Sequence, residues 1–226
     1  MAGLQVQGAG GVVVGADAEA AKPFHVSSKP IPYGALGHYR CSTRTRLLLS
    51  QAATSRIFEI RNAHATNLLI PTSIHLRWAQ GPLDLHTATI ENSLDIYKAT
   101  AFTVVDPTGT PVTPLTTALR TSMAASQVQV RANALAGLAA GITGGTLTLE
   151  ANPFAQLPNF LLAAPVATAV PPPAVDLFWS PGVDAAEHPL VLAPNEGIVI
   201  ANRVLLGAAA GSSVYIDVQW AEVTVY

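Results

Sequence analysis

Charged residues are scarce in this chain of 226 amino acids. Only 12% of its residues are Asp, Glu, Lys or Arg, and 50% are hydrophobic, whereas charged residues make up about 25% of an average soluble protein. A chain with so little charge must cover much apolar surface. We therefore expect it to assemble with copies of itself or within a larger structure, the alternative being a well-packed domain with an alanine- and threonine-rich surface.

Long apolar runs are also missing. The most apolar stretches, such as residues 160–170, are broken by proline and stay below the roughly 18 residues that a membrane-spanning helix needs. The first 15 residues contain no Lys or Arg ahead of their apolar residues, although a secretory signal would have them. We expect a chain without a secretory signal and without a membrane partner.

Cysteine occurs once, as Cys41, so no internal disulfide can form and nothing indicates an oxidising compartment. His38 lies three residues away, but a structural thiol is expected here and not a nucleophile. Among the histidines, His75 and His86 have carboxylates close by in the sequence, yet they lack the His-x-His pair of a cupin-like metal site. We predict neither a metal nor another cofactor.

Common catalytic and nucleotide-binding motifs are absent: there is no GxSxG, HExxH, P-loop or glycine-rich dinucleotide fingerprint. Carboxylates are too sparse to indicate a pair for glycoside hydrolysis. The tryptophans, Trp78, Trp179 and Trp220, could form a sugar platform, but core or interface positions are favoured. The sequence therefore predicts a structural or binding protein without catalytic residues, and not an enzyme.

Alternation of apolar and polar residues is the main positive signal. Val214, Ile216, Val218 and Trp220 alternate with polar residues, which is typical of a strand with one buried face. The phase changes after Trp220, and a bulge near residues 221–222 would explain the change. Further strands are expected at residues 47–49, 57–61, 67–78, 93–105, 127–131, 146–150, 176–180 and 197–206.

The number of short strands, separated by turn signals such as DPTG at 106–109, indicates an all-β fold. We predict an antiparallel β-sandwich, and within that class a jelly roll, because two four-stranded sheets match the strand count and the long connections. An immunoglobulin-like sandwich is the alternative, although the chain is long for it and lacks its Cys–Trp–Cys pattern. Residues 127–150 are alanine-rich, but their glycines argue against a long helix.

An arm and a body make up the predicted domain organisation. Residues 1–34 contain a Gly-, Ala- and Val-rich start and a segment with three prolines, which favours an extended arm. Residues 35–226 form a single predicted sandwich domain, with residues 158–175 as a proline-rich connection over its surface. The arm reaches either a neighbouring subunit or across its own sandwich, and the sequence does not decide between them.

The few charges are unevenly distributed. Residues 1–80 hold eight basic and three acidic residues, whereas residues 151–226 hold one basic and six acidic residues. Blocks of opposite sign pair between neighbouring subunits, steer docking onto a charged partner, or neutralise each other within one fold. Most of the basic residues are arginines, which suit interface ion pairs better than lysines do.

The densest basic segment, residues 35–64, contains five arginines and one acid and suits an anionic partner. Nucleic acid is disfavoured because the pI is about 6.3 and because interleaved aromatics and lysines are missing. Together with two aromatic residues of the arm, these arginines form the candidate interface: Arg40, Arg44, Arg46, Arg56, Arg61, Phe24 and Tyr33.

Five short motifs stand out in the body. They are Leu-Gly-x-Tyr-Arg, ending at residues 37–40, Ile-Phe-x-x-Arg at 57–61, His-Pro-Leu-x-Leu at 188–192, Asn-Glu-Gly-x-x-Ile at 195–200 and Trp-Ala-Glu-Val at 220–223. In these motifs the chain resembles small virion proteins from the structural-gene clusters of tailed bacteriophages. The resemblance covers most of residues 35–226, and no catalytic residue carries over with it.

The resemblance implies a head decoration (cement) protein, a β-sandwich on the virion capsid that bridges major capsid subunits and stabilises the head. Its implied partners are the major capsid protein and copies of itself, with a homotrimer favoured. A tail or head–tail component, or a receptor-binding sandwich, is the alternative.

Overall fold

The chain divides into two compact units, Met1–Pro32 and Tyr33–Tyr226, in the computed structural model. In the first unit, β1 (Gln5–Gln7) pairs antiparallel with β2 (Val13–Gly15), and the rest of the predicted arm lies outside the described residues. The structure describes residues 5–7, 13–15, 37–45, 48, 51–79, 90–114, 125–134, 141–161, 175–179, 189–206 and 212–224.

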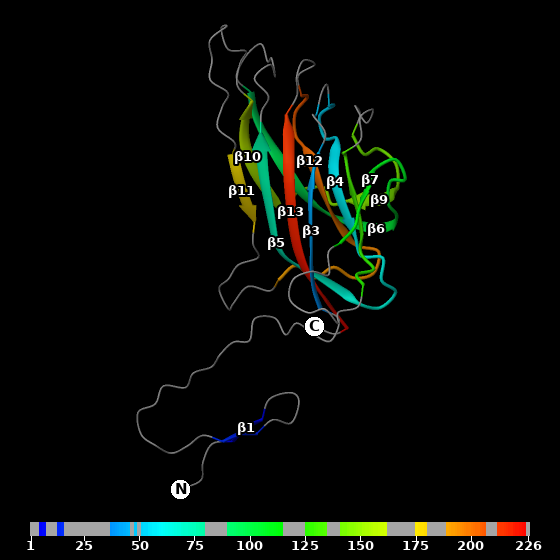
Figure 1. The fold of residues 1–226 in the computed structure, drawn as a ribbon, viewed down its shortest axis with the longest axis vertical. Coiled ribbons are helices and arrows are strands. Elements are labelled where there is room, and N and C mark those ends of the chain that lie inside the picture. The colour runs from blue at the N-terminus through cyan, green and yellow to red at the C-terminus, as the bar shows by residue number, and fades with distance from the viewer. Residues whose placement is uncertain are drawn as a thin grey trace, which may run out of the picture. The chain divides into compact units, whose positions relative to one another are not determined.

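Two antiparallel sheets build the second unit, and the smaller one lies in front of the larger one in Figure 1. The four-stranded sheet has the order β11 (Val175–Trp179), β5 (Leu68–Ala79), β13 (Ser213–Val223) and β3 (Gly37–Arg44). The seven-stranded sheet has the order β10 (Ala155–Leu161), β6 (Ile90–Val104), β12 (Gly197–Asn202), β4 (Arg56–Arg61), β8 (Gln129–Ala132) and β7 (Thr110–Val112), with β9 (Thr146–Leu149) paired to β6.

The order of the strands is that of a jelly roll. The small sheet reads β3-β13-β5-β11, and the matching part of the large sheet reads β4-β12-β6-β10. Along the chain β3, β4, β5 and β6 alternate between the sheets, β10 then pairs with β6 in the large sheet, and β11, β12 and β13 alternate again. The last two strands enter the middle of each sheet, as in two interlocked Greek keys. Strands β7, β8 and β9 are additions to the large sheet. The prediction of an antiparallel, jelly-roll-like sandwich is confirmed.

The main core lies between the inner faces of the two sheets. Every second side chain of β13 points inward, and each faces apolar side chains of β5 and of the large sheet. A fully buried side chain of this size stabilises the fold by about 1.5–3 kcal/mol. The largest members, all at most 1% exposed, are Trp78, Trp220, Tyr39, Phe58, Leu48, Ile57, Ile60, Leu69, Ile74 and Leu76.

Strand β12 is buried on both of its faces. Ile198 and Ile200 belong to the main core, whereas Val199 joins a second cluster on the other side of the large sheet with Phe102. This double burial explains why residues 197–201 form a continuous apolar run without alternation.

Several element boundaries differ from those that the sequence predicts. The strand expected at residues 197–206 ends at Asn202. A strand was expected at residues 47–49, but the strand is β3 (Gly37–Arg44), and within 47–49 the described residue, Leu48, makes an isolated bridge to Ser212. The predicted connection over 158–175 is wrong at its start, because Pro158 lies inside β10, opposite Ser93. Because β10 is an edge strand, it has one unpaired side, and a proline whose nitrogen faces that side removes no ladder hydrogen bond. Residues 162–174 lie outside the described part.

The bulge expected in the C-terminal strand near residues 221–222 is not on that strand but on its neighbour β5. The pairing of β13 with β5 shifts between Gln219 and Trp220, and Thr72 is the extra residue on β5. Glu222 stays in phase with Trp220 and is only 5% exposed, because its Oε1 accepts hydrogen bonds from Trp220 Nε1 and Ser126 Oγ. In the sequence, a polar residue at position 222 looks like a break in the alternation. In the structure, Glu222 occupies an inward position because its carboxylate is hydrogen-bonded there.

Candidate functional site

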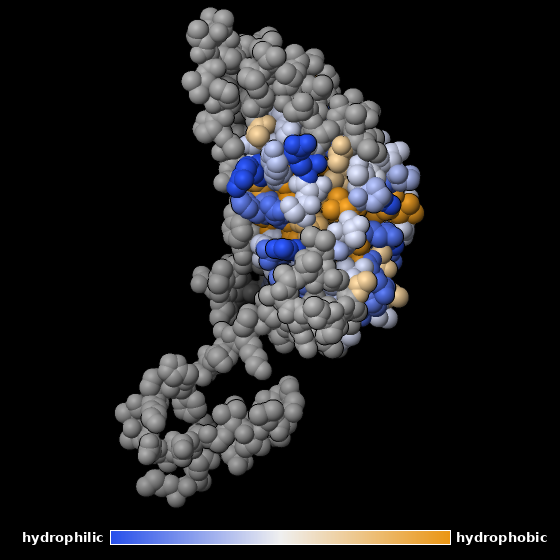
Figure 2. Space-filling model, viewed as in Figure 1, coloured by the Kyte–Doolittle hydropathy of each residue, from blue (hydrophilic) through white to orange (hydrophobic). Residues whose placement is uncertain are grey.

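The outer face of the four-stranded sheet is polar. On β13 the outward residues are Tyr215, Asp217 and Gln219, which alternate with the buried core residues. Figure 2 shows hydrophilic residues gathered on the side of the molecule that β3, β13 and β5 form in Figure 1. This face is a row of side chains on a rigid framework, because the inward residues of the same strands are packed in the core.

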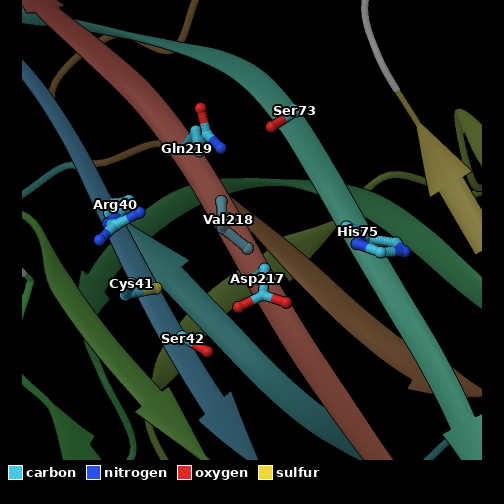
Figure 3. Close-up of a pocket in the computed structure, with 8 residues that line it drawn as sticks. All are labelled: Arg40, Cys41, Ser42, Ser73, His75, Asp217, Val218 and Gln219. Atoms are coloured by element: carbon cyan, nitrogen blue, oxygen red, sulfur yellow. The ribbon is translucent and has the colours of Figure 1, made fainter.

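Strand register brings outward residues of three strands side by side. Gln219 lies opposite Arg40 of β3 and Ser73 of β5, and Asp217 lies opposite Ser42 and His75. Cross-strand neighbours of this kind have Cβ atoms about 4.5–5.5 Å apart. Figure 3 shows Asp217 and Gln219 between the residues of β3 and those of β5.

A groove of about 450 Å³ runs over this part of the sheet. Its side chains offer a carboxylate, a guanidinium, an amide, an imidazole and two hydroxyls, so hydrogen-bond donors and acceptors alternate along it. The lining residues are Arg40, Ser42, Ser73, His75, Asp217 and Gln219, with Cys41 and Val218 beneath them.

An aromatic residue lies next to the groove on β13. Tyr215 is 40% exposed, and the Arg44 Cζ atom lies 5.9 Å from the centroid of its ring. This distance is within the range of a cation–π interaction, which fixes the position of the ring. Arg77 of β5 is opposite Tyr215 on the other side, and Asp176 of β11 pairs in register with Arg77.

The layer beneath the face is closely packed. Tyr39 and Trp220 stack with ring centroids 6.1 Å apart and an interplanar angle of 22°. Burial raises the pKa of the Cys41 thiol to about 12, with a backbone hydrogen bond from Val218 acting in the opposite direction. At neutral pH this buried thiol is therefore protonated and inert, in agreement with the structural role that the sequence predicts.

The predicted interface arginines do not form one patch. Arg40 and Arg44 are exposed on the outer face of β3, whereas Arg56 and Arg61 belong to β4 in the other sheet. Arg46, Phe24 and Tyr33 lie outside the described residues.

The two arginines of β4 are engaged in holding the fold. Arg56 donates to the Glu59 carboxylate at 3.1 Å and to the carbonyl of Gly144. Arg61 donates to the carbonyl of Phe102, to Gln129 Oε1 at 2.9 Å and to Asn195 Oδ1 at 2.6 Å. Charge-assisted hydrogen bonds to several partners are characteristic of a structural arginine.

The residues Asp217, Gln219, Ser73 and His75 were not identified from the sequence as site residues. Their alternation with apolar neighbours signals that they point outward. That they share one groove depends on the register between β5, β13 and β3, which follows from pairing over more than 100 residues of chain.

Histidines in the described residues do not gather with other metal ligands. No group of three or more His, Cys, Asp or Glu residues that could hold a metal ion occurs in the described part. His75 lines the groove, and His86, its proposed partner, lies outside the described residues. His64 is used in a loop, where its Nδ1 accepts the backbone N–H groups of Thr66 and Asn67.

Over the ranges that the structure describes, no helix is long and apolar enough to cross a membrane. Comparison with models of protein families, with curated proteins and with solved structures finds no match to this chain.

Proposed function

We propose that this chain is a structural protein of a tailed-bacteriophage virion that decorates the head, binding the major capsid protein as a homotrimer and stabilising the shell. The observation that carries the proposal is that the phage-like segments of the sequence meet in space and form the framework of the jelly roll. They lie on β3, on β4, before and within β12, and on β13.

Specific contacts join these segments. Arg61, from the Ile-Phe-x-x-Arg segment, donates to Asn195 of the Asn-Glu-Gly segment at 2.6 Å. The Asn62 N–H, next to Arg61, donates to the Glu196 carbonyl and links the same two parts of the chain. Tyr39 and Trp220, from the first and last segments, stack on each other. Matching segments that are far apart in the sequence but contact each other in the fold favour a structural resemblance over a chance match of short sequences.

The physical demands on a decoration protein match this framework. A protein that bridges capsid subunits needs a stiff body and surfaces that bind neighbours without a large charge. The two packed sheets give the stiffness, and the low content of charged residues suits extended contact faces. Residues 1–34 are the proposed contact with neighbouring subunits. In this mode of binding, an extended segment adds a strand to the edge of a partner's sheet.

Cryo-electron microscopy of intact particles that contain this chain tests the proposal. We expect many copies on the capsid surface, arranged as trimers over junctions between major capsid subunits. A few copies confined to the tail or to the portal vertex would contradict the decoration role and would favour the tail or receptor-binding alternative.

A further inference from the structure

We propose that the groove on the outer face of the four-stranded sheet binds a carboxylate-bearing oligosaccharide. This binding activity goes beyond the proposed capsid role and does not depend on it. The volume of the groove, about 450 Å³, falls within the range of about 300–1,000 Å³ that ligand sites occupy.

The chemistry of the lining favours a ligand rich in hydroxyl groups. Asp217 supplies acceptors, Arg40 supplies donors, and Gln219, Ser42 and Ser73 supply both. A sugar hydroxyl donates one hydrogen bond and accepts others, so a surface with both kinds of group within one strand spacing of each other satisfies it. An apolar ligand would leave these groups without partners, which costs free energy.

Tyr215 provides the apolar contact that sugar recognition also requires. It lies two residues from Asp217 on the same face of β13, which places the two side chains about 7 Å apart along the strand. The ring is 40% exposed and is flanked by the Arg44 guanidinium. An aromatic ring that is held in place offers a flat surface for the C–H face of a pyranose at little entropic cost.

The charge of the face selects an acidic sugar. Arg40 and Arg44 are both exposed on β3, on either side of Ser42, and guanidinium groups match the planar geometry of a carboxylate. On the β5 side, Arg77 has Asp176 of β11 opposite it in register. The β3 side of the groove is therefore positive in a chain whose net charge is −2.

The position of Asp217 distinguishes an acidic sugar from a nucleic acid. Its carboxylate lies in the middle of the groove, between Ser42 and His75. A continuous phosphate backbone would be repelled there, because like charges at short distance disfavour binding. An oligosaccharide presents hydroxyls to Asp217 and carboxylates to the arginines at the same time.

Isothermal titration calorimetry with the full chain tests this inference. The probes are oligogalacturonate and the same oligomer with its carboxylates methyl-esterified, so the sugar hydroxyls are the same and the negative charges are replaced by neutral methyl esters. We expect the acidic oligomer to bind and the affinity of the ester to be at least about tenfold lower, because the ester cannot form a charge-assisted pair with the arginines.

Variants locate the binding. Arg40→Ala and Tyr215→Ala should each weaken binding of oligogalacturonate about tenfold. Arg203→Ala is the matched control, since Arg203 is exposed but lies after β12, away from the groove, and it should bind as the original chain does. Thermal unfolding of each variant shows that it is folded.

Three outcomes would overturn the inference: no binding of either oligomer, equal loss in all three variants, or equally tight binding of polyphosphate. The first removes the sugar site, the second indicates unspecific attraction, and the third indicates a general anion surface. None of these results bears on the location of the protein in the virion, so the decoration role is tested separately.

Discussion

Two buried carboxylates on β4 and the loop after β6 have opposite preferences for a proton. Burial raises the pKa of Glu59, although the Asp106 N–H and the Arg56 guanidinium lower it in part. Burial alone would also raise the pKa of Asp106, but hydrogen bonds from Thr108 and from the Gly144 N–H hold it below its usual value. The pair joins β4 to two loops.

The Asp106→Asn variant should lose about 1–3 kcal/mol of unfolding free energy at neutral pH, because its NH₂ group would face the N–H of Gly144 and leave donors without acceptors. A lowered pKa stabilises the fold above about pH 4 and this stabilisation is lost as the pH falls further. The difference between the two proteins should therefore shrink in acid. The contribution of Glu59 has the opposite sign, and the substitution reduces it in part, because the charge of Asp106 is one of the causes that raise the pKa of Glu59.

Urea unfolding at pH values from about 3 to about 7, a range that includes the ordinary pKa of an aspartate at about 4, measures the difference in unfolding free energy between the two proteins. The control is Asp217→Asn, an exposed aspartate on the outer face, which should change the stability by less than about 0.5 kcal/mol. A difference for Asp106→Asn that stays constant over the pH range would contradict the assignment.

At the scale of residues, the sequence predicts the exposure of some arginines and not of others. Arg40 and Arg44 were identified as interface residues from their place in the basic segment, and both are exposed. Arg56 and Arg61 had the same signal, yet they bind groups of their own sheet. Local composition does not tell an exposed arginine from one that closes a hydrogen-bond network, because the partners come from distant strands.

At the scale of elements, neighbouring strands pack closely around the start of β12. Gly197 begins this strand, and a Cβ atom there would overlap the Ile60 carbonyl oxygen of β4 and lie 2.8 Å from the Phe102 ring. The bare glycine thus lets β4 and the end of β6 approach from both sides, which is one reason why a glycine stands inside a strand.

The Gly197→Ala variant should be destabilised by about 3 kcal/mol, since the added methyl group must push backbone apart. Gly109→Ala is the graded control, because its Cβ atom would meet the Arg131 Cβ atom at 3.0 Å and the neighbour can yield. Urea unfolding followed by tryptophan fluorescence compares them. Equal losses in both variants, or recovery when Phe102→Ala is added to Gly197→Ala, would show that the Ile60 carbonyl is not the obstacle.

Strands were predictable where one face is apolar and the other polar. Residues 67–78 and 93–105 correspond to β5 (Leu68–Ala79) and β6 (Ile90–Val104). The strand β3 was missed, because its inward residues Tyr39 and Cys41 are separated by charged and polar residues and form too short a pattern. Pro158 concealed β10, since a proline argues against a strand unless the strand lies at an edge.

At the scale of the whole molecule, both core clusters of the described residues belong to the second compact unit. Their buried members lie between Tyr39 and Trp220. Deletion of residues 1–34 should therefore change the melting temperature by less than about 4 °C, the shift for roughly 1 kcal/mol in a domain of this size.

The same truncated chain should no longer bind capsids that lack the protein, because residues 1–34 carry the proposed contacts with neighbours. Circular dichroism follows the melting, and sedimentation with capsids follows the binding, with the full chain as control. Retained capsid binding would overturn the role of the arm, and loss of folded structure would overturn the independence of the body.

The jelly-roll order has a consequence for synthesis on the ribosome. The strands that occupy the middle of both sheets, β12 and β13, are the last of the body to emerge. Until then β3, β4, β5 and β6 each lack a neighbour, so four strand edges wait unpaired. The chain completes its sheets only after translation of about residue 223, and during that interval it depends on slow long-range pairing and is open to aggregation.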